Sequence, residues 1–572
     1  MVAIWSAKII STACRLSGRQ GVTFAGKVAL RIDPNCLRDL SAQVRKKIFV
    51  VCGTNGKTTT NNLLCSAIEQ ENTSDVFVGK NSGEDGNASR KKENNHSGGY
   101  SGEKTGGIRK NKVVCNHTGS NMLAGVAAAF VLAAKNDGSL DADYACIEID
   151  EASTLRVFPH FKPDYMVLTN LFRDQLDRYG EIDITMDMLN RAMQMAPDMQ
   201  IIVNADDALS SYLAMESGHE FVTYGITERV FSEEEQGEQH EIREGRFCKN
   251  CGARLDYEFY HYSQIGKYNC PNCEFTRPAV DYEALHIDMS DGLAFDVLER
   301  HKIARQSSME DSDDESITDE NMKIKDAVKT ADAVKTDNAV KTVDSVKTEK
   351  AYAVRKKLRK REIHEYQSRH IYADYRGFYN IYNILAAYSA ARNAGLKLNQ
   401  FEQILSNYNP QNGRMEHFQI RGTDVILNLA KNPAGFNQNI SAVMEDKKEK
   451  DIIIVINDNA QDGTDISWLW DVDFDRFGKK KTNVNESAGK VKENQQLPGA
   501  GGTGEGIHSI TVSGIRCQDM RLRMKYVDIP CEMTPDVKDA IEARLADGCG
   551  NLYVLVNYTA LFSTRNILAG MK

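Results

Sequence analysis

The run Val50–Thr60, VVCGTNGKTTT, constrains the fold most, because an apolar strand passes through a glycine-rich turn directly into a helix. Such a turn presents backbone N–H groups and the positive end of a helix to a phosphate group. We expect Lys57 to reach the β- and γ-phosphates of ATP and Thr58 to hold Mg²⁺. The other predicted nucleotide contacts in this loop are Gly53, Thr54, Asn55, Gly56 and Thr59. The loop is shorter than the general Walker pattern, since Val51 stands where that pattern has another glycine. Its place between strand and helix still favours a working phosphate loop over an incidental Gly-Lys-Thr turn.

Further short apolar segments alternate with helical ones along the chain. We expect strands at Lys47–Cys52, Tyr144–Ile149, Tyr165–Thr169, Met199–Val203, Glu220–Tyr224, Asp451–Ile456, Ile507–Ser513 and Leu552–Val556, and helices at Thr58–Glu69 and Asp536–Leu545. Alternation of this kind is typical of parallel sheets covered by helices. The chain is therefore predicted to be an α/β protein with two separate sheets.

Three polar segments look like insertions between these elements. Residues 80–111 and 479–506 are rich in Gly, Asn and Lys, and residues 305–350 contain a six-residue repeat of the type DAVKTA. None of them carries enough apolar surface to offset the entropy lost on ordering. We interpret all three as mobile loops, and the repeat as an expanded loop rather than a β-helix.

Composition excludes several classes of function. The net charge of −9 and the lack of a basic stripe argue against nucleic-acid binding. No apolar run is long enough for a membrane span, and residues 1–20 lack the apolar core of a secretory signal. We interpret residues 1–20 as an amphipathic helix, with contact to a membrane surface or a partner as the alternative. The thirteen cysteines are mostly scattered in apolar surroundings, which is typical of a reducing, cytoplasmic compartment.

Four of the cysteines form two paired motifs. Cys248 and Cys251 are followed, after 18 intervening residues, by Cys270 and Cys273. Two such knuckles are suited to four thiolates around a tetrahedral Zn²⁺, with a structural role because no position is left open for water. Unmetallated thiols are the alternative. A nucleic-acid-binding ribbon is disfavoured, since 257–268 contains few basic residues.

Several motifs, taken in order, resemble those of the Mur ligase family. They are Gly53–Thr58 (GTNGKT), Glu148–Ala152 (EIDEA), Thr169–Leu171 (TNL), Asp174–Gly180 (DQLDRYG), Asn204–Asp207 (NADD), Gly377–Asn383 (GFYNIYN) with Ala386 and Ala387, and Gly413–Glu416 (GRME). The resemblance covers residues 45–572 apart from the insertions, and motifs in a fixed order are more specific than any one alone.

The resemblance implies an architecture. Residues 1–44 would be a helical segment, and 45–412 a central P-loop ATPase domain with a zinc ribbon inserted at 246–278. Residues 413–572 would form a Rossmann-like α/β C-terminal domain. Only about 45 residues precede the phosphate loop, too few for the UDP-binding domain of typical members.

The resemblance also assigns roles to residues. Glu148 would ligate Mg²⁺ and act with Lys57 in catalysis, while Asn380, Asn383 and Arg414 would contact the nucleotide. The chain departs from the usual pattern at two positions, because Gln175 and Tyr379 stand where the family has histidines. A second Mg²⁺ site is therefore not predicted.

Within the family, the chain resembles the MurT branch. The matching segments are Asn428–Gly435 (NLAKNPAG), Asn457–Trp468 (NDNAQDGTDISW), Ser513–Arg516 and Asn557–Ala560, together with the paired cysteines. This branch implies ATP-dependent amidation of the D-glutamate α-carboxyl of lipid II to D-isoglutamine, through an acyl phosphate, at the inner face of the plasma membrane. Ammonia would come from a separate GatD-type glutaminase subunit, since this chain shows no glutaminase motif.

The branch also implies that Asp465 completes a Cys–His pair on that partner. Without the resemblance, Asp462 and Asp465 are ordinary turn-formers beside glycine. Two other functions stay open: an amino-acid-adding ligase of the Mur or folylpolyglutamate type, and a non-catalytic ATP-binding scaffold.

Overall fold

The computed structural model describes residues 1–16, 21–73, 109–117, 119–172, 182–232, 244–301, 365–374, 376–408, 413–459, 462, 465–478, 503–547 and 550–571. Most of the three predicted insertions lies outside these residues. Their described ends are ordered. Arg109–Lys110 forms β3 and pairs with β2 (Asn72–Thr73), and Thr503 bridges to Gly478. Two of the predicted insertions, 80–111 and 479–506, therefore include ordered residues at their C-terminal ends.

A nine-stranded sheet forms the body of the larger lobe, with strand order β13-β12-β11-β8-β7-β6-β1-β5-β4. In this order, all neighbouring strands between β11 and β4 are parallel. At the other edge, β12 pairs antiparallel with both β11 and β13. Their bounds are β1 Lys47–Cys52, β4 Val113–Cys115, β5 Tyr144–Glu148, β6 Tyr165–Leu168, β7 Gln200–Asn204, β8 Phe221–Ile226, β11 Tyr282–Asp288, β12 Leu293–His301 and β13 Glu365–Ala373. The central strands are buried on both faces, as expected for a parallel sheet.

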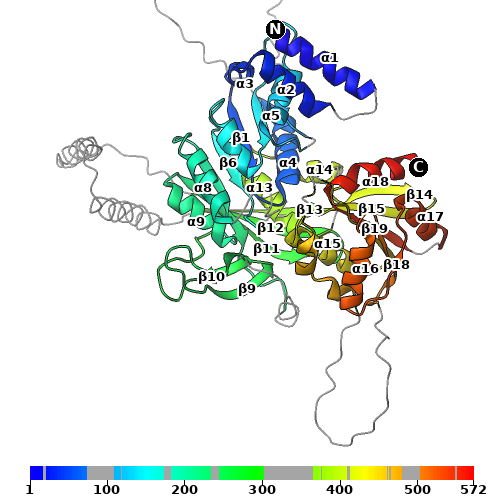
Figure 1. The fold of residues 1–572 in the computed structure, drawn as a ribbon. Helices are drawn as coiled ribbons and strands as arrows, with labels where there is room; N and C mark the ends of the chain where they lie inside the picture. Colours follow the sequence, from blue (N-terminus) through cyan, green and yellow to red (C-terminus); the bar gives the residue numbers. More distant parts are fainter. Residues whose placement is uncertain are drawn as a thin grey trace, which may run out of the picture.

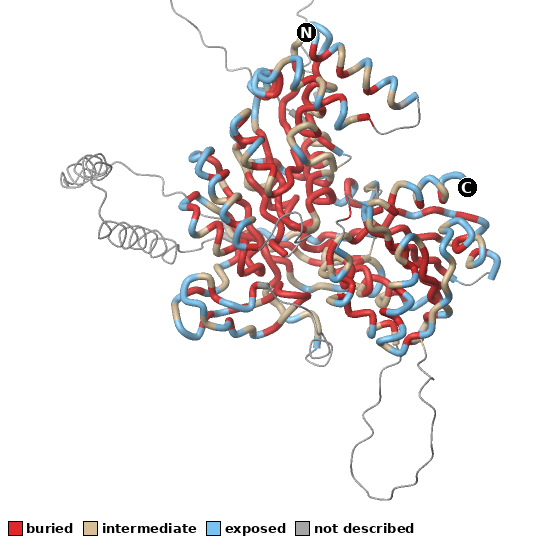
Figure 2. Tube along the Cα trace, in the orientation of Figure 1, coloured by how far each residue is buried: buried red, intermediate tan, exposed pale blue. Residues whose placement is uncertain are grey.

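Helices cover both faces of this sheet (Figure 1). One face packs on α4 (Lys57–Gln70), α13 (Tyr379–Asn393) and α14 (Phe401–Asn407). The other packs on α5 (Leu123–Ala133), α6 (Thr154–Val157), α8 (Ile182–Met193) and α9 (Ala208–Ser217). Figure 2 shows the buried residues concentrated in the strands and on the inner faces of these helices.

Three N-terminal helices extend the second of these layers. They are α1 (Val2–Leu16), α2 (Val22–Ile32) and α3 (Cys36–Ser41), and their buried residues belong to the same core as those of α5. A Cβ added at Gly26 would lie 1.7 Å from the carbonyl oxygen of Ala124, so only glycine permits this approach of α2 to α5. The sequence pattern predicted bounds for the first of these helices only, and the other two lie within the predicted helical segment 1–44.

A small hairpin, β9 (Asp256–Tyr262) and β10 (Ile265–Asn269), projects from the larger lobe. It lies between the two cysteine pairs, and Cys248, Leu255, Tyr268, Cys270 and Phe275 share a small core with Ala208 of α9. The segment with the four cysteines is thus a compact unit of its own, attached to the larger lobe at α9.

The smaller lobe is a six-stranded sheet of order β14-β15-β19-β16-β17-β18, in which only β14 is antiparallel. Its strands are β14 Glu416–Ile420, β15 Thr423–Leu429, β16 Lys450–Val455, β17 Ile507–Ser513, β18 Glu532–Met533 and β19 Asn551–Val556. Helices α15 (Pro433–Glu445) and α16 (Cys517–Tyr526) cover one face, and α17 (Val537–Asp547) and α18 (Tyr558–Gly570) the other. The predicted pair of parallel sheets is confirmed, and each strand and helix predicted by range between residues 47 and 556 agrees to within two residues.

Candidate functional site

The phosphate loop lies between β1 and α4, as the sequence predicted. Gly53 and Gly56 adopt φ values of +121° and +84°, which disfavour any residue with a Cβ. A Cβ at Gly56 would also lie 2.1 Å from Oδ1 of Asn383. The loop is therefore packed directly against the first turn of α13, where the predicted adenine-side residues lie.

Lys57 opens α4 and is almost fully buried. Its Nζ atom forms an ion pair of 3.0 Å with Oε1 of Glu151, and donates to the carbonyl oxygens of Gly53 and Thr54. Burial alone would lower the pKa of Lys57, but the carboxylates of Glu151, Asp150 and Glu148 raise it above its ordinary value. The ammonium group is thus charged and held in the loop. The sequence motif contained Glu151 but gave no sign of this pairing.

Thr58 and Glu148 meet beside the loop, although 90 residues separate them in sequence. The Thr58 hydroxyl donates to Oε2 of Glu148 at 2.7 Å, and Nδ2 of Asn121 donates to Oε1 at 3.0 Å. Asn116 binds both the backbone N–H and the backbone carbonyl of Glu148, which fixes the end of β5. A hydroxyl and a carboxylate are oxygen ligands of the kind that Mg²⁺ prefers. The sequence did not identify the two asparagines, since they belong to no motif.

A cleft opens from the phosphate loop toward the smaller lobe. The larger lobe contributes to its lining Asn55, Gly56, Thr59, Asn170, Tyr262, Tyr379, Asn380, Asn383 and Tyr408. The residues from Gly413 onward contribute Arg414, Asn428–Lys431, Gly435, Gln438 and Asn439. The structure therefore brings the predicted residues Asn380, Asn383 and Arg414 together with the phosphate loop. The residues contributed by α15 were not predicted as site residues.

Tyr379 lies in this cleft, and burial raises the pKa of its phenol. A neutral phenol offers a hydroxyl but no imidazole nitrogen, so this position lacks the metal ligand that the family pattern would place there. The other departure, Gln175, lies outside the described residues.

The two lobes touch at the phosphate loop itself. Nδ2 of Asn432 donates to Oδ1 of Asn55 at 3.4 Å, while Oδ1 of Asn432 accepts from the N–H of Gly435 and so caps α15. Pro433 follows at the first helical position, where no N–H is needed. The Asn428–Gly435 segment thus starts a helix whose N-terminus faces the nucleotide loop.

Asp462 and Asp465 occupy different environments. Asp462 is buried, accepts a hydrogen bond from the N–H of Thr559, and has a pKa raised by burial. Asp465 is exposed, and its carboxylate accepts from the N–H and the hydroxyl of Ser467 at 2.8 and 2.9 Å. Asp462 therefore anchors the start of α18, whereas Asp465 shapes a turn and still presents its carboxylate at the surface.

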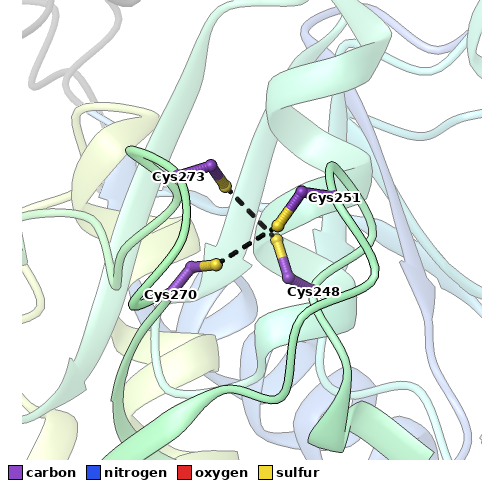
Figure 3. Close-up of side chains that lie close together, drawn as sticks. All are labelled: Cys248, Cys251, Cys270 and Cys273. Carbon is purple, nitrogen blue, oxygen red and sulfur yellow. Dashed lines mark hydrogen bonds between the residues drawn. The ribbon is translucent and has the colours of Figure 1, made fainter.

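The four paired cysteines converge on one point, from two facing loops (Figure 3). Cys248 and Cys273 have their sulfur atoms 3.5 Å apart, as do Cys251 and Cys270, and all four sulfurs lie within 4.8 Å of one another. Tetrahedral Zn–S bonds would place the sulfurs about 3.8 Å apart. The backbone N–H of Ala253 lowers the pKa of Cys251 to about 6, whereas burial raises the pKa of Cys248 and of Cys273. The geometry and the thiol chemistry fit a single tetrahedral thiophilic metal ion.

A buried chain of polar contacts links the segment with the four cysteines, residues 246–278 (the cysteine lobe), to the nucleotide cleft. Asp206 is fully buried and is paired with the guanidinium of Arg277. Its other oxygen accepts from the Tyr382 hydroxyl at 2.6 Å, and His261 lies 2.7 Å from the same hydroxyl. Because Tyr382 precedes Asn383 on α13, this chain supports the helix that lines the cleft. The NADD motif suggested no such connection.

A third group of possible metal ligands lies between α4, which contains Cys65, and the end of β4, at Cys115. The ligand atoms of Cys65, Cys115 and His117 lie within 4.8 Å of one another. The hydrogen bond with Cys115 and burial raise the pKa of Cys65 well above its ordinary value, which favours a packed, protonated thiol pair.

Two protein families match separate parts of the chain. Residues 51–275 match the Mur ligase middle domain, and residues 429–497 and 502–561 match the MurT ligase C-terminal domain. The first match contains the phosphate loop and the four cysteines, and the second contains Asn432 and Asp465.

Curated relatives cover nearly the whole chain. It is 29% identical over 563 residues to the Staphylococcus aureus "Lipid II isoglutaminyl synthase (glutamine-hydrolyzing) subunit MurT", covering 98% of this chain and 95% of the relative. The Streptococcus pneumoniae protein of the same description is 25% identical over 560 residues, covering 97% and 93%.

Solved structures show the same fold at low identity. A pseudomurein peptide ligase type C from Methanothermus fervidus aligns with a TM-score of 0.53 at 16% identity, over 93% of this chain and 80% of that one. MurF from Acinetobacter baumannii aligns with a TM-score of 0.51 at 11% identity, over 96% and 80%. The Mur ligase-like α/β fold predicted from the motifs is confirmed.

Proposed function

We propose that this chain, an ATP-dependent ligase of the Mur ligase family related to the MurT subunits, is the synthetase half of a glutamine-dependent amidotransferase. Its reaction would convert the D-glutamate α-carboxyl of the lipid II stem peptide to D-isoglutamine. This amidation would take place on the cytoplasmic side of the plasma membrane. The relatives are described as subunits of a glutamine-hydrolysing lipid II isoglutaminyl synthase.

The observation that carries the proposal is the arrangement of Lys57, Thr58 and Glu148 in and beside a phosphate loop whose residues Asn55, Gly56 and Thr59 line a cleft shared by two lobes. A charged amine lies in the loop, and an oxygen pair lies one residue further along the helix. The opposite wall is supplied by Arg414 and the N-terminus of α15. A mere binding scaffold needs the loop but not a second wall of polar groups facing it.

The chemistry follows from this placement. A carboxylate is a poor acyl donor, so phosphoryl transfer from ATP must first convert it to an acyl phosphate, which ammonia then attacks. Mg²⁺, held by Thr58 and Glu148, would neutralise charge on the phosphates. Lys57 would leave Glu151 and donate to the transferred phosphoryl oxygens. Asn380, Asn383 and Arg414 would hold the nucleotide, together with the loop residues Gly53, Thr54, Asn55, Gly56 and Thr59.

The cysteine lobe would bind one Zn²⁺ through Cys248, Cys251, Cys270 and Cys273, as an inserted zinc ribbon. Four thiolates leave no coordination position open, so the metal would stabilise the local fold and take no part in the reaction. The ribbon would act on catalysis only by supporting α13 through Asp206 and Tyr382.

Ammonia would come from a GatD-type glutaminase. Such an enzyme needs a cysteine nucleophile and a histidine whose charged form is stabilised by a third group. Asp465 is exposed and belongs to the segment Asn457–Trp468 that resembles the MurT branch. It would supply that carboxylate across the subunit interface. Its bonds to the N–H and hydroxyl of Ser467 help to orient the exposed side chain.

Reconstitution tests the proposal. The chain is incubated with lipid II, ATP, Mg²⁺, glutamine and a candidate GatD-type subunit, and the stem peptide is analysed by mass spectrometry. Conversion of one carboxyl to a carboxamide, dependent on ATP and on both proteins, is expected. Addition of an amino acid instead would identify an amino-acid-adding ligase, and nucleotide binding without any product would identify a scaffold.

A further inference from the structure

Helix α1 has an unusual distribution of large and small residues. Its inward face carries the buried residues Ala3, Ile4, Ala7 and Ser11, and the partly buried Ile10 packs against the same core. Its exposed face carries Val2, Trp5, Ile9 and Leu16, at helical spacing, with exposed fractions between 55% and 85%. A helix of a soluble domain normally turns its large apolar residues inward. Here the protein core receives the smaller half of the apolar surface.

The exposed apolar residues are concentrated at this end of the chain. Among the described residues, seventeen large apolar side chains are exposed, and seven of them lie in residues 1–32. Besides the four on α1 they are Met1, Phe24 and Ile32. Single exposed apolar residues are ordinary, but a cluster on adjoining helices indicates a contact surface.

The charge of the same segment is opposite to that of the whole chain. Residues 1–32 contain five basic residues, Lys8, Arg15, Arg19, Lys27 and Arg31, and no acidic residue, whereas the chain carries a net charge of −9. Lys27 and Arg31 are exposed on α2, next to Phe24. An apolar stripe bordered by cations is the pattern of a helix that lies in an anionic lipid interface.

Trp5 adds a second feature typical of such an interface. Its indole N–H donates to the carbonyl oxygen of Asn136 at 2.9 Å, while 55% of the side chain remains exposed. The ring is thus anchored at its polar edge, as is common for tryptophan at the boundary between water and lipid.

The position of α1 permits this contact. The helix lies at the outer end of the larger lobe, beyond α2 and α5 (Figure 1), and Figure 2 shows exposed residues along its trace. Among the described residues, no helix has the length and apolar character needed to cross a bilayer. Contact would therefore be with the surface of the membrane.

We propose that the α1–α2 face, formed by Val2, Trp5, Ile9, Leu16, Phe24, Lys27 and Arg31, docks on the surface of an anionic lipid bilayer. A second copy of the chain is a poorer occupant, because a two-fold contact would oppose the same cations. Docking would hold the chain at the membrane that contains a lipid-linked substrate, and to that extent the inference deepens the proposed function. Adsorption to lipid itself does not depend on that function.

Vesicle co-sedimentation of the full chain tests the inference. Vesicles of phosphatidylglycerol mixed with phosphatidylcholine are compared with phosphatidylcholine alone, at low and high salt. We expect binding to the anionic vesicles that weakens with salt and falls at least tenfold in Ile9→Ser and in Lys27→Glu/Arg31→Glu. The matched control is Ile184→Ser, since Ile184 is also an exposed helical isoleucine, at 53% against 64% for Ile9. The control should bind as the wild type does.

Fluorescence supplies an independent readout. Trp5 is one of three tryptophans, so a blue shift on adding anionic vesicles that disappears in Trp5→Phe would place this side chain in the lipid. Equal loss in Ile9→Ser and Ile184→Ser, or no vesicle binding at all, overturns the inference. So does weakened assembly with the glutaminase subunit, or a change in oligomeric state, as the only effect of Ile9→Ser.

The two proposals fail separately. If the protein amidates a short-chain, water-soluble substrate but does not bind vesicles, the proposed docking face is wrong and the proposed reaction still holds. Vesicle binding that is lost in Ile9→Ser, in a protein that amidates no substrate, would do the reverse.

Discussion

The Nζ atom of Lys57 lies 3.0 Å from Oε1 of Glu151, and both side chains are more than nine-tenths buried. The cation that would serve the phosphates is therefore paired with a protein carboxylate. To bind Lys57, the phosphates of ATP must take the place of the Glu151 carboxylate. The pair explains why a buried ammonium group is tolerated at all, since an isolated one would be strongly destabilising.

We expect Lys57→Ala to lower amidation at least about 100-fold, because phosphoryl charge loses its main protein cation. It should also reduce the free energy of unfolding by about 3 to 5 kcal/mol, because Glu151 is left buried and unpaired. The double variant Lys57→Met/Glu151→Gln removes both charges. It should recover most of the stability that is lost in Lys57→Ala, but none of the activity. Chemical denaturation and the amidation assay check both parts. A stable, active Lys57→Ala protein would contradict the assignment.

The second prediction concerns Thr58, whose hydroxyl meets Glu148 at 2.7 Å. Thr58→Ser keeps the hydroxyl and should keep most activity. Thr58→Val has nearly the same shape without the hydroxyl, and should lose activity about 10- to 1000-fold. Glu148→Gln should raise the Mg²⁺ concentration needed for half-maximal rate. A Mg²⁺ titration of all three variants is the measurement, and equal behaviour of serine and valine would remove Thr58 from the metal site.

The third prediction separates backbone strain from steric overlap at Gly56. Gly395 has a φ of +87°, close to the +84° of Gly56, and a Cβ there would meet nothing within 4 Å. Gly395→Ala should therefore cost only the strain, about 1 to 2 kcal/mol, and leave nucleotide affinity unchanged. Gly56→Ala should add the overlap with Asn383 and weaken nucleotide binding. Isothermal titration with a non-hydrolysable ATP analogue compares them, and equal affinities would show that the contact has no role.

The fourth prediction is one zinc ion per chain. Elemental analysis of the purified protein should give about one equivalent, and Cys270→Ser should lower both the zinc content and the melting temperature. Cys531→Ser is the control, because Cys531 is a partly exposed thiol outside the cluster. Zinc content that is negligible in the wild type, or equal in both variants, would contradict the proposed site.

The last prediction concerns Asp465. Asp465→Asn should suppress glutamine-driven amidation and spare ammonium-driven amidation, because an amide cannot stabilise an imidazolium on the partner. Ser467→Ala removes one turn contact of Asp465 and keeps its carboxylate. If the residue acts through the turn alone, both variants should behave alike and affect both nitrogen sources equally. The ratio of the two rates, measured in each variant, distinguishes the two roles.

The predictable part of this protein is the part with strong local signals. The strand, turn and helix around Gly53 and Gly56 follow from apolar runs and glycine chemistry, and the two CxxC motifs from their spacing. Partners that meet across the fold leave no such trace. Glu151 lies inside a motif but its pairing with Lys57 depends on where β5 ends. Asn121 contacts Glu148 from a loop without any pattern.

The bounds of α2 and α3, within the predicted segment 1–44, could not be predicted, for a physical reason. Helix α2 buries Ala25, Gly26 and Ala29, and these side chains produce little contrast in a hydrophobic pattern. Their role is to let helices approach closely, which depends on α5 as much as on α2.

The chain of contacts from Arg277 through Asp206 to Tyr382 means that the cysteine lobe cannot be excised as an independent module. Removing 246–278 would take away the guanidinium that faces a fully buried carboxylate, directly behind the helix that lines the nucleotide cleft. A shortened chain would need Asp206 replaced at the same time. Lobe and catalytic body must therefore change together, in evolution and in any attempt to build a minimal version of this ligase.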